Sequence, residues 1–207
     1  MITKEYPNPQ VVQLISSQID VDRMDYLQRD AYNTGVTYGK FDLSRILRVI
    51  RPHENGIAFQ FQGMHAVEDY IVRRYQMYMQ VYFHPVSRGM EVTLDRLLTR
   101  ARDLYQAGQL SPATPFLEPF FEGNYSVEDY LHLDDHVLMY AISVWVNSQD
   151  RYLSTLAKMF LNRQPLKSVE FDRKRDTETV EYLRDLVDQL FYDRKYFTMT
   201  NHSSDIS

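Results

Sequence analysis

The sequence predicts a mainly α fold with a small β component, an α+β chain in which helices dominate. Of its 207 residues, 44% are hydrophobic and 25% are charged, a balance typical of globular proteins rather than disordered ones. Hydrophobic residues recur at helical spacing through most of the chain, and it contains only seven glycines and eight prolines that could interrupt helices. One Asn-Gly pair between two β-prone runs is the strongest local sign of a hairpin.

In the first part of the chain, the sequence predicts three helices and this hairpin. The helices are expected at residues 10–17, 20–33 and 43–49. Gly35 ends the second helix, because glycine readily adopts the left-handed conformation of a helix C-terminus, and Asp42 suits the N-cap of the third. Asn55-Gly56 then joins the strand-like runs 48–53 and 57–62.

Two long helices follow, from Met64 to about Pro85 and from residue 87 to 107. Proline cannot continue the helical hydrogen bonds, and Gly108 suits the second C-terminus. Residues 109–125 contain three prolines and predict an irregular joint between sub-domains. Helices opening at Ser126 and covering 133–147 and 151–162 come next, before a tail predicted as strand 167–171, helix 178–192 and strand 195–200.

Composition excludes several classes of protein. The absence of cysteine excludes disulfide scaffolds, thiolate metal sites and a cysteine nucleophile. No apolar run approaches the roughly 18 residues of a membrane span, and the first ten residues lack the apolar part of a secretory leader. A net charge of -5 argues against binding long nucleic acid through overall charge. We therefore expect a cytoplasmic protein without membrane or long nucleic-acid partners.

The helix predicted at 20–33 carries the most informative pattern. At 100° per residue, Asp22, Tyr26 and Asp30 share one face, and the opposite face is apolar. Asp22 and Asp30 stand about 12 Å apart along the axis, roughly the reach of a nucleotide. The alternative is a solvated face with pairs four residues apart, such as Asp25 with Arg29.

The block Asp20-Val-Asp-Arg-Met-Asp-Tyr-Leu, followed by Arg29-Asp30 and Gly35, resembles the end of the catalytic core of HD-domain phosphohydrolases. The branch that it resembles is the deoxynucleoside triphosphate triphosphohydrolases of the SAM- and HD-domain type and their bacterial relatives. A second block, residues 73–85, is similar as well. The resemblance covers residues 10–107 and becomes general after residue 108.

The resemblance implies a role for each of six residues. In that family a divalent metal (Mg, Mn, Fe or similar) is held by a His, a His-Asp pair and a later Asp, and hydrolysis yields a deoxynucleoside and triphosphate. By position, the later metal ligand is Asp22, the phosphate-binding residues are Arg23 and Arg74, and the sugar-binding residues are Tyr26, Asp30 and Tyr82.

Arg74 invites the same interpretation without the resemblance. It lies on a mostly apolar helical stripe, where an unpaired charge is costly, so it needs an anion. That anion is either a phosphate or a carboxylate of the chain, such as Asp30 or Glu68.

The family's other metal ligands are missing. No histidine precedes His53, and none of the six histidines is followed by Asp. We therefore expect a C-terminal fragment that is inactive alone and does not retain the metal. The expected regions are 1–40, the end of the HD core; 41–108, a hairpin and two long helices that complete the pocket; 109–165, helical; and 166–207, a small α+β tail.

Two further motifs are better explained by surface or structural roles than by ligand binding. His132 and His136 stand four residues apart, as in helical zinc sites, but surface or capping roles fit them better. The basic run 173–175 could bind an effector anion, though a solvated loop is the commoner case.

The sequence thus predicts part of a metal-dependent hydrolase of deoxynucleoside triphosphates that forms a homo-oligomer. The first alternative is a non-catalytic module for nucleotide binding, oligomerisation or regulation, which the missing ligands favour. The second is an HD-type phosphodiesterase, against which Tyr26 and Asp30 argue because the pair suits a free 3′-hydroxyl.

Overall fold

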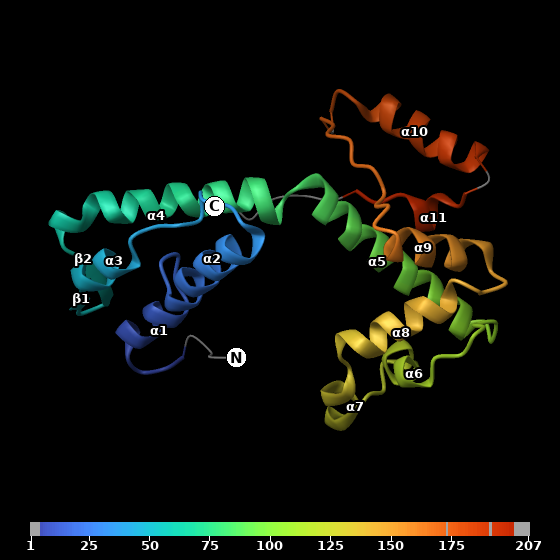
Figure 1. Cartoon of the computed structure of the whole chain (residues 1–207), viewed down its shortest axis with the longest axis horizontal. Helices are drawn as coiled ribbons and strands as arrows, with labels where there is room; N and C mark the ends of the chain where they lie inside the picture. The colour runs from blue at the N-terminus through green and yellow to red at the C-terminus, as the bar shows by residue number, and fades with distance from the viewer. Residues whose placement is uncertain (1–4, 173, 191, 201–207) are drawn as a thin grey trace. The chain divides into compact units, whose positions relative to one another are not determined.

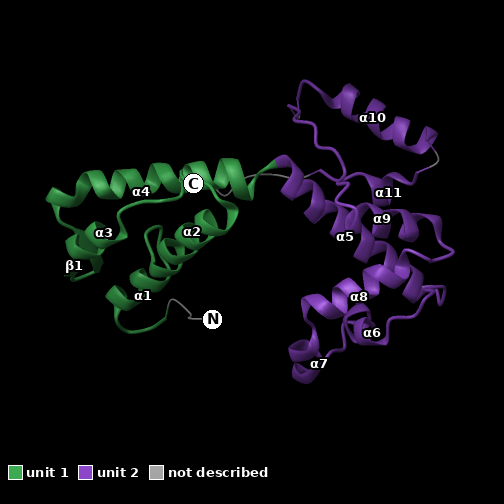
Figure 2. Ribbon diagram, in the orientation of Figure 1, with its two compact units in different colours: residues 1–84, 203–207 green, residues 85–202 purple. Residues whose placement is uncertain are grey.

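The computed structural model describes residues 5–172, 174–190 and 192–200, and the chain is mostly helical with one two-stranded antiparallel sheet (Figure 1). It forms two compact units that divide between His84 and Pro85 (Figure 2). The expected joint at 109–125 is not the dividing point. Those residues lie within the second unit, where Leu117 is buried in the core and the Trp145 indole donates a hydrogen bond to the Pro112 carbonyl.

The first unit follows the predicted order of elements closely. Its helices and strands are α1 (Pro9–Ile15), α2 (Val21–Thr34), α3 (Leu43–Val49), β1 (Ile50–His53), β2 (Gly56–Phe59), the 3₁₀ turn η1 (Phe61–Gly63), α4 (Met64–Met77) and the π-helical turn η2 (Tyr78–Tyr82). The Asp20 and Asp42 side chains cap α2 and α3. Gly35 ends α2 at φ 74°, the left-handed conformation predicted for it.

The hairpin pairs Ile50 with Phe59 and His53 with Gly56, so Glu54 and Asn55 form its two-residue turn. Gly56 is the first residue of β2, and the turn therefore lies one position before the Asn55-Gly56 turn that the sequence predicts. It is held against α1 by Gln13, whose Oε1 accepts a hydrogen bond from the Ile57 amide at 2.8 Å. A Cβ on Gly56 would lie only 2.2 Å from that same oxygen, so glycine permits both the turn and this contact.

The core of the first unit lies between α2 and α4. The apolar face of α2 is fully buried at Leu27 and Ala31, as its periodicity predicts, and it packs with Ile46, Tyr70 and Met77. The two helices run parallel, because contacts join residues with a constant offset: Gln18 with Tyr70, Tyr26 with Tyr78 and Asp30 with Tyr82. The polar face of α2 and the end of α4 are therefore neighbours.

The second unit is entirely helical in its described residues. Its elements are α5 (Pro85–Gln106), the 3₁₀ turn η3 (Pro115–Leu117), α6 (Glu118–Glu122), α7 (Val127–His132), α8 (Asp135–Trp145), α9 (Arg151–Leu161), α10 (Thr177–Gln189) and α11 (Arg194–Phe197). Helices α5, α8 and α9 build its core, and Trp145 is completely buried there. No helix in the described residues combines the length and apolar character that crossing a bilayer demands.

Both strands predicted in the tail are wrong. Residues 167–171 form no ladder within the described structure, and residues 194–197 form α11 instead, which the Asp193 side chain caps. A strand is stabilised by a partner, and composition alone cannot supply one. The predicted helix between them is confirmed as α10.

Candidate functional site

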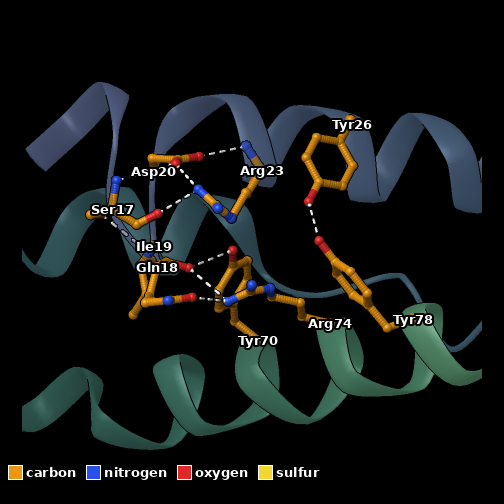
Figure 3. Close-up of polar contacts among 9 residues, drawn as sticks. All are labelled: Ser17, Gln18, Ile19, Asp20, Arg23, Tyr26, Tyr70, Arg74 and Tyr78. Atoms are coloured by element: carbon orange, nitrogen blue, oxygen red, sulfur yellow. Dashed lines mark hydrogen bonds and ion pairs between the residues drawn. The ribbon is translucent and has the colours of Figure 1, made fainter. Parts of the chain in front are cut away.

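A group of polar and aromatic side chains fills the space between α2 and the α4–η2 helix (Figure 3). We call it the α2–α4 cluster. Its members are Gln18, Arg23, Tyr26, Asp30, Tyr70, Arg74, Tyr78 and Tyr82. Five of the six residues that the resemblance singles out belong to it, and these five come from two blocks about fifty residues apart in the sequence.

Arg23 is neutralised by Asp20. The Asp20 carboxylate is almost fully buried; it accepts a hydrogen bond from the Arg23 amide at 2.7 Å and forms an ion pair with the Arg23 guanidinium. That guanidinium also donates to the Ser17 carbonyl at 2.6 Å. Burial lowers the pKa of Arg23, but the charge and hydrogen bond of Asp20 outweigh it, so the pKa is raised. The side chain is thereby fixed in place and permanently charged.

Asp30 is tied to the other end of the cluster. Its Oδ2 accepts a hydrogen bond of 2.7 Å from the Tyr82 hydroxyl, and the Tyr26 ring packs edge-on against the Tyr82 ring at 6.0 Å. The Tyr26 and Tyr78 hydroxyls lie 3.2 Å apart. Burial first, and then these hydrogen bonds, raise the pKa of Tyr26 and of Tyr82. Both phenols therefore remain neutral hydrogen-bonding groups across the physiological range.

Arg74 lies at the centre of the cluster and is held by neutral groups. Its Nη1 donates to the Gln18 side-chain oxygen at 2.5 Å, and the guanidinium carbon lies 5.4 Å from the centre of the Tyr78 ring. In the described part of the chain no carboxylate pairs with it, so neither Asp30 nor Glu68 supplies the anion that the sequence offered as an alternative. Tyr70 donates to the Gln18 carbonyl at 3.2 Å, and its burial raises its pKa to about 12.

The cluster thus has one positive and one negative group without an ionic partner in the described structure, Arg74 and Asp30. Tyrosine rings and hydroxyls lie between them. Such an arrangement can bind a ligand with an anionic part and a hydroxyl-bearing part, because a guanidinium recognises phosphate and a carboxylate accepts from a hydroxyl. It is chemistry suited to a nucleotide.

Asp22 differs from the other predicted residues. It is exposed in the first turn of α2, and none of the described residues bonds to its carboxylate. No group of three or more His, Cys, Asp or Glu side chains in the described residues is placed to hold a metal ion. A single carboxylate does not fit the requirements of a catalytic divalent metal, so the residues that the structure describes do not build a metal site by themselves.

The histidine pair and the Asp25–Arg29 pair have the surface and helix-end roles that the sequence favoured or offered as an alternative. His132 ends α7 and His136 begins α8, with Asp134 as the N-cap between them, so the two imidazoles do not share a helix. Asp25 pairs with Arg29 on the exposed surface at 2.8 Å. The basic run 173–175 begins at Arg173, which lies outside the described residues.

Sequence reasoning missed three members of the cluster as functional candidates. Tyr70 and Tyr78 share the helical stripe of Arg74, and that spacing was the available signal. Gln18 lies between α1 and α2, where nothing in the local pattern predicts its contact with Arg74.

Comparisons with known proteins show what the chain as a whole is similar to. Residues 41–114 match the family model described as the HD associated region. The chain is 48% identical over 207 residues to the uncharacterized protein YwfO of Bacillus subtilis, and 26% identical over 144 residues to a putative HD domain-containing protein of Acanthamoeba polyphaga mimivirus. The crystal structure of a phosphohydrolase from Bacteroides thetaiotaomicron superposes with a TM-score of 0.76 at 32% identity over 91% of this chain. These matches support an HD-domain phosphohydrolase family.

The chain spans only part of each of these proteins. It covers 48% of YwfO, 28% of the mimivirus protein and 50% of the Bacteroides structure. The similarity therefore bears on a region of an HD-type hydrolase, and the activity of a whole protein is a matter for proposal.

Proposed function

We propose that this chain is the nucleotide-binding part of a metal-dependent HD-domain phosphohydrolase that acts on deoxynucleoside triphosphates. The observation that carries the proposal is the α2–α4 cluster, in which Arg74, without an ionic partner in the described residues, and Asp30, bound by Tyr82, both take part in contacts between α2 and the α4–η2 helix. The anionic part of the ligand would bind at the arginine and its sugar at the carboxylate.

Each residue of the cluster has a defined task in this proposal. Arg74 and Arg23 bind the phosphates. The uncompensated charge of Arg74 stabilises the negative charge that develops during hydrolysis, whereas Arg23, paired with Asp20, contributes hydrogen bonds. The hydrogen bond from Tyr82 orients Asp30, whose carboxylate accepts from the 3′-hydroxyl. Tyr26 and Tyr82, packed edge to face, form the wall against the deoxyribose. Asp22 is one ligand of a metal whose remaining ligands lie outside the described residues.

A binding experiment tests the sugar assignment directly. We expect the chain to bind dGTP, and Asp30→Ala to weaken that binding about tenfold or more, since a hydrogen bond to a charged group contributes about 1.5–3 kcal/mol. The analogue ddGTP lacks the 3′-hydroxyl and should bind the parent chain with the same loss. The Asp30→Ala variant should bind the two nucleotides equally, which a titration of all four combinations would measure.

Arg29→Ala is the matched control for this cycle. Arg29 lies on the same helix one residue away, is 61% exposed and pairs only with Asp25. Its loss should leave dGTP binding unchanged. If Asp30→Ala still distinguishes dGTP from ddGTP, the carboxylate does not hold the 3′-hydroxyl and the assignment is wrong.

A second candidate is a non-catalytic nucleotide-binding or oligomerisation module, favoured by the isolated position of Asp22. Both proposals predict no turnover of dGTP by this chain with Mg²⁺ or Mn²⁺. The two proposals give different predictions for a longer polypeptide in which this chain is joined to a segment that carries the missing His and His-Asp ligands. Turnover there, abolished by Asp22→Ala, supports the hydrolase; a dGTP-dependent change in mass in solution without turnover supports the module.

A further inference from the structure

The second unit contains a groove beside its core that the proposed function does not use; Leu166, Val187 and Phe197 belong to both the core and the groove. A cavity of about 680 Å³ lies between α10, the start of α5 and the segments 166–171 and 197–200. Its exposed lining is mainly apolar; α10 contributes Val180, Leu183, Leu186 and Val187, and Leu190 follows as the C-cap. Helix α10 contains no buried residue, and Leu190 remains 58% exposed. This helix therefore presents its apolar face to a space that the described residues leave open.

One wall of the groove is a stretch of main chain without hydrogen-bond partners. Residues 167–171 contain no helix, turn or bend, and in the described structure no hydrogen bond reaches their amide or carbonyl groups. The last paired amide before them is that of Leu166, which donates to the Thr93 hydroxyl at 3.2 Å. All five residues are exposed, so water can solvate these groups, and the unpaired main chain remains available to pair with an added strand.

The same stretch has the composition of a strand. Val169 and Phe171 alternate with Ser168 and Glu170, so a period of two places the two apolar side chains on one side. Val169 is 64% exposed and Phe171 is 37% exposed. The residues are those of a β-strand, but the partner strand is absent from the described residues.

We propose that this groove is a strand-acceptor site. It binds an extended polypeptide segment with alternating apolar side chains, which pairs with the main chain of residues 167–171 and places its apolar side chains against α10. The added strand satisfies the free amides and carbonyls and covers the aliphatic wall at the same time.

The free main-chain groups decide the chemistry of the occupant. A helix satisfies its own main-chain groups and a hydrocarbon chain has none, so neither would pair with residues 167–171. An extended polypeptide matches both the apolar wall and the unpaired backbone. Matched proteins such as YwfO are about twice as long as this chain, so in such proteins polypeptide outside the matched region is available to supply the strand.

A synthetic strand tests the proposal on the chain as it is. The probe is an eight-residue peptide of alternating threonine and valine with a lysine at each end, and binding is followed by fluorescence anisotropy. At ten times its dissociation constant the peptide should slow hydrogen exchange about tenfold at the alternate amides of residues 168–171 that face the added strand. A peptide of the same sequence, N-methylated on alternate residues, keeps the side chains, loses the backbone donors and should not bind.

Two proline variants supply the matched control. Neighbouring amides of a strand point to opposite sides, so of Ser168→Pro and Val169→Pro only one removes an amide that faces the added strand. One should weaken peptide binding at least tenfold and the other much less. The emission of the single tryptophan, Trp145, checks that both variants keep their fold.

Three results would overturn the proposal. The first is equal protection by the N-methylated peptide, and the second is equal protection by an amphipathic helical peptide. The third is slow exchange at residues 168–171 in the chain alone that becomes fast on dilution, which would mean that a second copy occupies the groove.

Discussion

Removal of the Asp150 charge should destabilise the second unit strongly. The carboxylate caps α9, where it accepts from the Leu153 amide at 2.8 Å, and it binds the Arg100 guanidinium through two hydrogen bonds of 2.5 and 3.1 Å. Arg100 also donates to the Tyr196 hydroxyl at 3.1 Å. A single carboxylate therefore connects α5, α9 and α11, and each partner of the ion pair is only 20% exposed.

Two substitutions distinguish the stability that the Asp150 charge contributes from the stability that its N-cap hydrogen bond contributes. Asp150→Asn keeps an acceptor at the N-cap but leaves Arg100 without an anion. Exposed pairs contribute about 0–1 kcal/mol, and breaking a fully buried pair costs about 3–5 kcal/mol. This pair is mostly buried, so we expect a loss of about 2 kcal/mol. Asp150→Ala loses the cap as well, which adds about 1 kcal/mol.

Tryptophan fluorescence measures this loss in the second unit alone, because Trp145 is the only tryptophan and is buried in that unit's core. At about 4 °C per kcal/mol for a unit of this size, the Asn variant should melt about 8 °C and the Ala variant about 12 °C below the parent. Asp95→Asn is the control and should change little, because the Asp95 carboxylate is 53% exposed and lies 3.5 Å from Arg96 without a hydrogen bond to it. Melting of the Asn variant within 2 °C of the parent would refute the reasoning.

Three further predictions follow from other contacts. Burial would raise the pKa of Asp150, but Arg100 and the α9 amides outweigh it and lower the pKa below its ordinary value of about 3.9. The stability that this carboxylate contributes is therefore present above about pH 4 and is lost as the pH falls through the lower pKa of the folded state. The difference in melting temperature between the parent chain and Asp150→Asn should therefore become smaller in acid. Gly39→Ala should destabilise the first unit by about 1–3 kcal/mol, because the new Cβ would lie 2.6 Å from both the Ala31 Cβ and the Met77 sulfur. Gly35→Ala places its Cβ near no other atom and should cost only about 1 kcal/mol, through the strain of its left-handed backbone conformation. Tyrosine emission during urea unfolding measures both losses. Tyr70 should remain protonated at pH 11, which the Cζ resonance of labelled tyrosine would show once assigned with Tyr70→Phe; titration before pH 11 would contradict its burial.

Elements defined by local chemistry could be predicted from the sequence. Gly35 ends α2, Asp42 caps α3 and a tight turn before Gly56 closes the hairpin, and each of these effects acts within a few residues. The apolar stripe of α2 predicted its buried face for the same reason. The two tail strands failed, because a strand depends on a partner that sequence periodicity does not identify.

The candidate site could be predicted only in part. Periodicity placed Tyr26 and Asp30 on one face of α2, but only the resemblance linked them to Arg74 and Tyr82, since no local rule joins residues so far apart. The π-helical turn at 78–82 was not predicted either, because the helical period assumed for the whole stretch contains no such turn. The Asp20 ion pair, which neutralises Arg23 and leaves Arg74 as the uncompensated cation, required the structure.

The constant offset between α2 and α4 makes the first unit unequally tolerant of changes in length. An extra residue at the Glu54-Asn55 turn would lengthen the connection between the helices without altering which of their side chains meet, since the hairpin tip lies outside their contacts. One extra residue at Gln28 would rotate everything after it on α2 by about 100° and carry Asp30 away from Tyr82, while Tyr26 kept its partner. Natural variation in length should therefore accumulate at the hairpin tip and be rare within the two helices.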